Sequence, residues 1–156
     1  MTQDEDREAT ARAIIDTSLY MTLATADPSG RPWASPVYYA VAGYREFFWI
    51  SEPGATHSRN LTSRAEVAIV IFDSTAPINT GRGVYMRAVA EEVEGAEVER
   101  GIEVFSRRSQ EHGGEAFTSG DVEPPAPVRL YRATASEHSL LELRRPVRVP
   151  VSLGSD

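Results

Sequence analysis

The richest set of polar side chains in the sequence follows an apolar segment, in the stretch SEPGATHSRN over residues 51–60. Thr56 is predicted to be the N-cap of a short helix, while Ser58 adds a second hydroxyl, Arg59 a positive charge and His57 a hydrogen-bonding ring. The first turn of a helix also offers free backbone N–H groups and the positive end of the helix dipole. This combination favours a phosphate-binding site, and it is also compatible with an ordinary capped helix whose arginine is solvated.

Other kinds of catalytic chemistry have little support in the sequence. The three histidines, His57, His112 and His138, are scattered along the chain, and we expect no metal site. The chain has no cysteine and no lysine, which excludes a thiol nucleophile, a Schiff-base lysine and a P-loop lysine. It also has no G-x-S-x-G or G-x-G-x-x-G motif, so hydrolase and Rossmann-type assignments are weak. No catalytic residue is identified from the sequence.

The hydrophobic pattern predicts the elements that position residues 51–60. We expect helices over residues 4–17, 57–64 and 97–110, and strands over residues 18–26, 31–41, 45–51, 66–73, 83–94 and 128–136. Asp27-Pro28-Ser29-Gly30 has the chemistry of a type I turn and predicts a hairpin, and Pro36 indicates a sheet edge or a bulge. The order of these elements predicts a mainly β fold of the α+β type, with an antiparallel barrel.

Two segments suggest contacts beyond a simple barrel. The run from Val67 to Phe72 holds six consecutive apolar residues, which predicts a strand buried on both faces by a helix or a second subunit. The tail over residues 137–156 combines leucines with Pro146 and Pro150, and it is predicted to be an arm packed on a neighbour. Aromatic side chains between Trp33 and Trp49 are mostly expected in the core, although such a wall also suits a flat heteroaromatic ring.

Length and charge define the broad class of the protein. The 156 residues favour one domain, residues 1–156, and the formal net charge of -7 argues against nonspecific nucleic-acid binding. Most of the negative excess lies in residues 91–123, which hold ten acids and three arginines. The N-terminus lacks the apolar segment of a signal peptide, and no window resembles a membrane helix. We therefore expect a cytoplasmic protein that acts without a membrane or a nucleic acid.

An ordered series of segments resembles a known family. LATADPSGRPWASPVYYA, FFWISEPGATHSRNL, AEVAIVIFD and GVYMRAVAEEV together resemble the pyridoxamine 5'-phosphate oxidase-like proteins over about residues 10–135. The resemblance implies a split β-barrel of six to seven antiparallel strands with short flanking helices. It also implies a homodimer that binds FMN, or in one branch the deazaflavin coenzyme F-420, at the dimer interface.

The resemblance also implies which residues hold the cofactor. Strand residues Ser35, Pro36, Val37 and Tyr38 correspond to the segment that runs along the flavin ring. The phosphate would be bound by Ser51 and by the turn and helix start, which here provide Thr56, His57, Ser58 and Arg59.

Departures from the oxidase pattern argue against vitamin B6 oxidation. Ser35 and Ala40 stand where true pyridoxamine phosphate oxidases have an arginine and a lysine, and Thr56 and His57 replace an Arg-Lys pair. The C-terminal Arg-x-His motif has no clear counterpart in LLELRRPVRVP. The resemblance is therefore to the family and not to a true pyridoxamine phosphate oxidase.

Three functions remain open at this point. The first is an FMN-dependent oxidoreductase that transfers hydride to or from a small organic substrate. The second is a deazaflavin-dependent reductase, with the acidic tail of coenzyme F-420 bound by Arg31, Arg59 or Arg64. The third is a non-catalytic protein that binds a flavin or another aromatic ligand.

Overall fold

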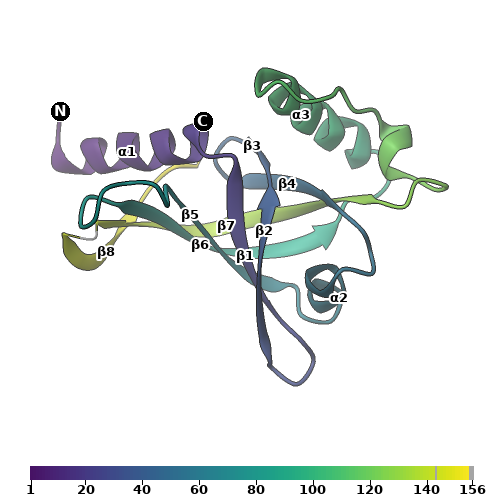
Figure 1. The fold of residues 1–156 in the computed structure, drawn as a ribbon, viewed down its shortest axis with the longest axis horizontal. Coiled ribbons are helices and arrows are strands. Elements are labelled where there is room, and N and C mark those ends of the chain that lie inside the picture. Colours follow the sequence, from purple (N-terminus) through teal and green to yellow (C-terminus); the bar gives the residue numbers. More distant parts are fainter. Residues whose placement is uncertain (143, 155–156) are drawn as a thin grey trace.

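The structure is a computed structural model that describes residues 1–142 and 144–154. Over these residues the chain forms one antiparallel sheet of eight strands, which curls into a half-barrel with three α-helices around it (Figure 1). This architecture confirms the prediction of a mainly β, α+β split barrel. None of the helices in the described ranges has the length and apolar character that crossing a membrane requires.

The elements follow one another in a simple order. They are α1 (Gln3–Thr17), β1 (Tyr20–Ala26), β2 (Pro32–Tyr38), β3 (Ala40–Ala42), β4 (Glu46–Ser51), α2 (Thr56–Ser63), β5 (Glu66–Phe72), β6 (Arg82–Glu92), α3 (Glu97–Glu111), a 3-10 turn (Ser119–Val122), β7 (Arg129–Glu142) and β8 (Arg145–Val151). The strand order in the sheet is β2-β1-β5-β6-β7-β4-β3, and β8 pairs with β7. The sheet has more strands than expected because the segment predicted over 31–41 divides into β2 and β3, and the tail adds β8.

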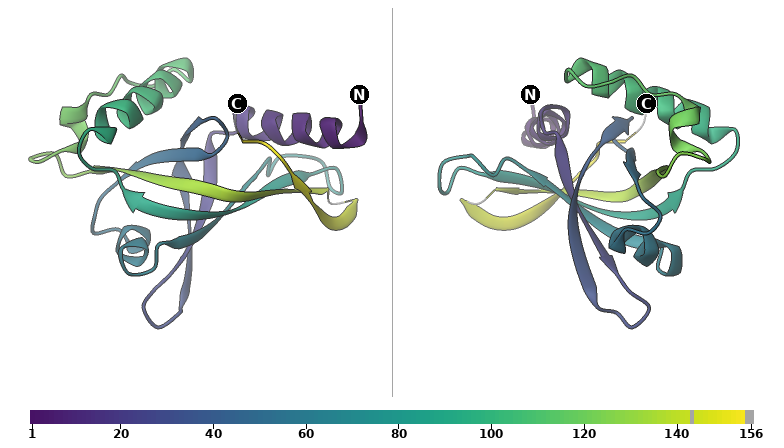
Figure 2. Two further views of the ribbon diagram at one scale, coloured as in Figure 1. Left: turned by 180° about the vertical axis from the view of Figure 1, so that it is seen from behind. Right: turned by 45° about the vertical axis from the view of Figure 1, so that its right-hand side comes forward.

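Two hydrophobic clusters lie on opposite faces of the curled sheet. The larger cluster fills the inside of the curl, where Trp49, Phe47 and Tyr39 are fully buried and where α1 and α2 contribute Ile15 and Leu61. The smaller cluster lies under α3, which packs against β3, β4 and β7 on the other face (Figure 2). The inner cluster therefore fixes the two helices that flank the barrel, including α2 with its polar first turn.

Within this chain strand β5 is buried on one face, so of the two predicted covers for its other face no helix in the described residues provides one. Val67, Ile69 and Ile71 point into the inner cluster, while Phe72 on the opposite face is 51% exposed. Neighbouring strands continue this exposed surface, which we call the open face. It comprises Tyr20, Ala24, Ala68, Val70, Phe72 and Val89. The apolar run forms a strand as predicted, and this chain leaves one side of that strand uncovered.

Strand β7 is longer than predicted and takes over much of the expected C-terminal arm. It continues through residues 137–142, and β8 then folds back on it in an antiparallel hairpin. Its two edges pair with β6 on one side and with β4 and β8 on the other. The described part of the tail is thus a strand of the same sheet, and residues 143 and 155–156 of the predicted arm lie outside the described residues.

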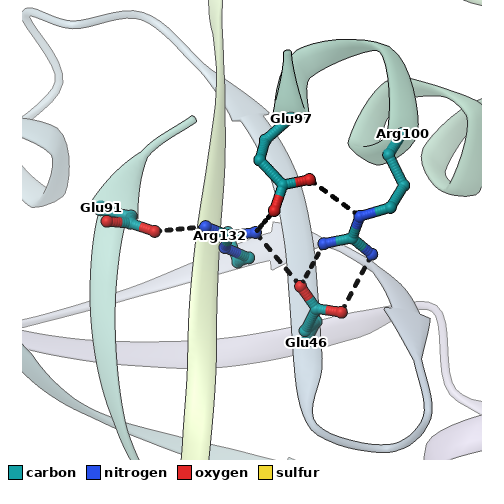
Figure 3. Close-up of polar contacts among 5 residues, drawn as sticks. All are labelled: Glu46, Glu91, Glu97, Arg100 and Arg132. Carbon is teal, nitrogen blue, oxygen red and sulfur yellow. Dashed lines mark hydrogen bonds and ion pairs between the residues drawn. The ribbon is translucent and has the colours of Figure 1, made fainter. Parts of the chain in front are cut away.

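An ion-pair cluster ties α3 to the sheet (Figure 3). Arg132 of β7 pairs with Glu46 at 3.2 Å, with Glu91 and with Glu97. Arg100 of α3 forms a bidentate pair with Glu46, at 3.0 and 2.6 Å. Hydrogen bonds from Arg100 are the main reason why the pKa of Glu46 lies below its usual value of 4.5.

This lowered pKa predicts a specific loss of stability in acid. The Glu46 carboxylate stabilises the fold above about pH 4.5, and the contribution is lost as the pH falls through the lowered pKa. The melting temperature should therefore fall more between pH 7 and about pH 3.5 in the wild type than in Glu46→Gln. Glu103→Gln, which changes an exposed pair on α3, should keep the wild-type pH dependence. Equal losses in wild type and Glu46→Gln would contradict the assigned role.

Candidate functional site

The first turn of α2 presents its polar side chains on two different sides. Thr56 and the exposed Arg59 line a groove, while His57 and Ser58 are buried toward the inner face of the barrel. Asn60 fixes the helix to the sheet, because its amide donates to Thr25 Oγ1 at 3.1 Å. The set of residues predicted to hold one phosphate is therefore divided between a groove and a buried cluster.

The groove lies between α2 and the turn that joins β1 to β2. Its volume is about 460 Å³, and it is lined by Asp27, Pro28, Arg31, Pro32, Trp33, Thr56, Arg59, Asn60 and Ser63. We call this hollow the α2 groove. It contains two guanidinium groups, one from each wall, and the half-exposed indole of Trp33.

The opposite wall of the α2 groove is a rigid turn. Asp27 Oδ1 accepts backbone N–H groups from Ser29 and Arg31, both at 2.9 Å, and Gly30 adopts a positive φ of 90° that favours glycine. These hydrogen bonds, chiefly the one from Arg31, hold the pKa of Asp27 below its usual value. Arg64 donates to Pro28 O at 3.1 Å and so ties the turn to the end of α2. The predicted turn is confirmed, and Asp27 is engaged in the turn itself.

Thr56 is not the N-cap predicted from the sequence. The helix begins at Thr56, its N-cap is Ala55, and no side chain caps the first turn. The Thr56 hydroxyl is therefore not used as a cap, and it lies along the α2 groove beside backbone N–H groups that no side chain satisfies. The sequence pattern predicted this helix correctly but placed its start at residue 57, one residue after the observed start at Thr56.

His57 and Ser51 meet behind the α2 groove. His57 Nε2 lies 2.9 Å from Ser51 Oγ at the end of β4. Burial lowers the pKa of His57, so its imidazole is largely neutral at pH 7. The pair joins the end of β4 to the start of α2 and holds the helix in place, without adding charge to the groove.

Ser58 is the most buried of the predicted binding residues. Its side chain is 1% exposed, and Oγ has no hydrogen-bond partner of ordinary geometry. It lies near Tyr131, whose pKa is raised by burial and lowered to a smaller extent by this hydroxyl. Ser58 therefore belongs to the interior behind the groove.

Strand β2 forms one edge of the sheet, as Pro36 predicted. Among the described strands it pairs only with β1, so one row of its backbone N–H and C=O groups has no ladder partner. Ser35 is half-buried, Pro36 is exposed and Val37 is buried. These residues form a continuous edge that begins next to the α2 groove at Pro32 and Trp33.

Tyr38 ends this edge far along β2 from the groove. Its hydroxyl lies 2.8 Å from His112 Nδ1, and its ring packs edge-on against Phe105 of α3. Burial raises the pKa of Tyr38. The Tyr38–His112 contact was not predicted, because the two residues are 74 positions apart and neither has a local motif.

The residues around the α2 groove fit a phosphate monoester with an attached aromatic group. Arg31, Arg59 and the Thr56 hydroxyl can bind the phosphate oxygens together with the uncapped helix start. Trp33 and the β2 edge can contact a flat ring. The sequence placed Trp33 among aromatic residues that are mostly expected in the core and that also suit a flat heteroaromatic ring. Among the described residues no group of three His, Cys, Asp or Glu side chains is arranged to bind a metal ion.

Comparison with known proteins identifies similar folds. The family model described as pyridoxamine 5'-phosphate oxidase matches residues 8–141. A heme binding protein from Mycobacterium smegmatis is similar at 19% identity and a TM-score of 0.75; the match covers 97% of this chain and 59% of that one. The heme storage protein HutZ from Vibrio cholerae is similar at 20% identity and a TM-score of 0.69, with 93% and 96% covered.

An F420 reductase is also similar, at 19% identity and a TM-score of 0.60, with 83% of this chain and 95% of that chain covered. No curated protein sequence matches the chain. At these identities the similar structures establish the fold, and the M. smegmatis protein is considerably longer than this chain.

Proposed function

Because this chain belongs to the pyridoxamine 5'-phosphate oxidase family, we propose that it is a flavin-binding oxidoreductase that holds the phosphate of FMN in the α2 groove. The observation that carries the proposal is the convergence of Arg31 and Arg59 from opposite walls onto one hollow. Thr56 and the uncapped start of α2 add neutral donors between them.

Each part of the site has a separate role in this proposal. Bound FMN supplies the hydride chemistry, and the chain supplies binding and orientation. The β2 edge at Ser35, Pro36 and Val37 offers backbone groups to the ring, and the Ser51–His57 pair positions α2 from behind. The substrate is a small organic molecule, and the lack of the oxidase cations at Ser35 and Ala40 argues against vitamin B6 oxidation.

A deazaflavin reductase is the second candidate, and the arginines around the groove favour it. Arg31 and Arg59 line the α2 groove, and Arg64 lies beside its turn with a hydrogen bond to Pro28 O. Three guanidinium groups near one opening suit the long acidic tail of coenzyme F-420. A structural neighbour is itself an F420 reductase, although its identity to this chain is low.

Heme binding, the property named for two other neighbours, has weaker support here. A heme iron needs an axial ligand such as histidine. His57 and His138 are buried, with Nε2 bonded to Ser51 Oγ and to Tyr44 O. His112 is exposed and bonded to Tyr38 through Nδ1, but it lies at the end of α3, on the far side of the fold from the α2 groove (Figure 1). A non-catalytic flavin-binding protein would use the same α2 groove, so activity measurements must distinguish it from an enzyme.

The proposal is tested by identifying the cofactor and then its chemistry. Mass spectrometry of ligand released from freshly purified protein should detect FMN, and titration of cofactor-free protein with FMN and with coenzyme F-420 should show which binds more tightly. Reduced cofactor with an artificial acceptor then separates an enzyme from a binding protein. Absence of binding to both cofactors would refute the proposed function.

A homodimer formed through the open face is part of the same proposal. The open face exposes Tyr20, Phe72 and Val89 beside the charged Glu66 and Arg87, and large apolar side chains exposed in one patch often mark a protein interface. Phe72→Asp should weaken the dimer at least about a hundredfold, because a two-fold interface contains the new charge twice. Light scattering after size-exclusion chromatography would give the molar mass of a monomer for the Phe72→Asp variant.

The matched control is Val147→Asp, which alters an exposed valine on the other face of the sheet, in the hollow beneath α1. This variant should stay dimeric. A wild-type chain that is monomeric at high concentration, or a Phe72→Asp variant that remains a dimer, would contradict the assignment of the open face.

A further inference from the structure

A second hollow, apart from the α2 groove, lies at a gap in the sheet. Strand β4 pairs with β7 as far as Thr134, and β8 pairs with β7 from His138 onward. Between them Ser136 and Glu137 have no strand on that edge, and the register against β6 shifts at Arg87. The hollow at this gap has a volume of about 780 Å³, and we call it the seam hollow.

We propose that the seam hollow binds a small organic anion with at least two negative charges. This would be a second ligand site, built from elements other than those of the α2 groove. The proposal does not depend on FMN binding in the α2 groove, because the two hollows share no residue; Ala68 of the open face does line the seam hollow.

The charges around the seam hollow carry the first part of the argument. Arg45, Arg87 and Arg148 line it from the β3–β4 turn, β6 and β8, and Glu137 is its one lining carboxylate among the described residues. Arg87 pairs with Glu137 at 3.2 Å. Arg45 and Arg148 have no carboxylate partner in the described ranges, so the hollow is positive in a chain whose net charge is -7. Two unpaired guanidinium groups at one opening favour an anion with two charges.

Both unpaired arginines are held in position by other contacts. The Arg148 guanidinium lies 5.6 Å from the centre of the Tyr85 ring, and Nη1 is 3.5 Å from Ser139 Oγ. The aliphatic part of Arg45 lies on Gly154, where an added Cβ would come within 2.5 Å of Arg45 Cδ. Gly154 thus lies beside Arg45 of the β3–β4 turn, and a side chain at position 154 would displace Arg45.

The remaining walls determine what kind of anion fits. Apolar surface in the seam hollow comes from Ala68, Tyr85, Pro150 and Val151, whereas Ile69, Met86 and Leu153 behind it are buried in the inner cluster. His138 is also buried there, with Nε2 donating to Tyr44 O at 2.7 Å. An organic body would contact the apolar walls, while its acidic groups would pair with Arg45 and Arg148. A phosphate monoester and a polycarboxylate both meet these requirements.

Isothermal titration of the full chain with citrate tests the proposal, because a phosphate monoester would also bind the α2 groove. Wild type should bind citrate, and Arg45→Ala with Arg148→Ala should weaken that binding by roughly tenfold for each arginine removed. Gly154→Ala should weaken it as well while all arginines are retained. Arg107→Ala on α3 and Arg59→Ala in the α2 groove should bind citrate like the wild type.

Three results would overturn the proposal. They are no citrate binding by wild type at millimolar concentration, unchanged citrate binding in the double variant, and loss of citrate binding in Arg59→Ala or Arg107→Ala. The last result would indicate the α2 groove or a general charge effect. Because Arg59→Ala and the seam variants alter different hollows, failure here leaves the flavin titration unaffected, and the reverse also holds.

Discussion

Replacing Arg59 by alanine should weaken FMN binding about tenfold to a hundredfold. A hydrogen bond to a charged partner contributes about 1.5–3 kcal/mol, and Arg59 provides one of the two guanidinium groups in the α2 groove. The exposure of Arg59 favours the lower end of this range, because solvent screens its charge. Fluorescence titration of cofactor-free protein with FMN measures the effect directly.

Arg107→Ala is the matched control for this experiment. Arg107 is also exposed, and it pairs with Glu103 on α3, well away from the groove. The Arg107→Ala variant should bind FMN like the wild type, while Arg31→Ala should weaken FMN binding as Arg59→Ala does. If Arg59→Ala and the wild type have the same affinity, the phosphate is not bound in the α2 groove.

Ile69→Asp should leave no stably folded protein at 25 °C. Ile69 is 2% exposed and belongs to the inner cluster, so an aspartate there would be an unpaired charge inside the barrel. The cost of several kcal/mol is comparable with the total stability of a typical domain, about 5–15 kcal/mol. Far-UV circular dichroism and urea titration would show the loss of the cooperative transition.

The neighbouring Ala68→Asp provides the comparison. Ala68 is on the same strand but points to the open face, where it is exposed in the protomer. It should remain folded. A stable Ile69→Asp protein, or an equal loss of stability in Ile69→Asp and Ala68→Asp, would contradict a β5 strand with one buried and one exposed face.

The sequence was sufficient to predict the helices and most strands, but it did not show which of their faces are covered by other parts of the structure. Alternating and apolar runs predicted every helix and most strands, and Pro36 correctly indicated an edge. The run Val67 to Phe72 looks the same whether a helix, a second subunit or solvent faces its outer side, so its exposure in the protomer could not be read from residue types. The polar residues Glu137 and Ser139 similarly concealed that β7 continues past 136.

The candidate site was predicted in composition and only partly in arrangement. Local order along the chain was enough to place Thr56 and Arg59 in one groove and the Ser51–His57 pair behind it. Which side chains of α2 face the groove and which face the core depends on how the helix sits on the sheet, and the sequence placed the helix start one residue too late. Arg31 and Trp33 join the groove through the β1–β2 hairpin, a tertiary contact that no local pattern contains.

The length of β7 has a consequence for how the molecule opens. This strand of 14 residues is bonded along one edge to β6 and along the other to both β4 and β8. None of the strands β4, β6 and β8 can separate from the sheet without breaking backbone hydrogen bonds to β7. Amide protons in the middle of β7 are therefore released to solvent only when the whole domain unfolds, whereas those of the β1–β2 turn exchange through small local openings.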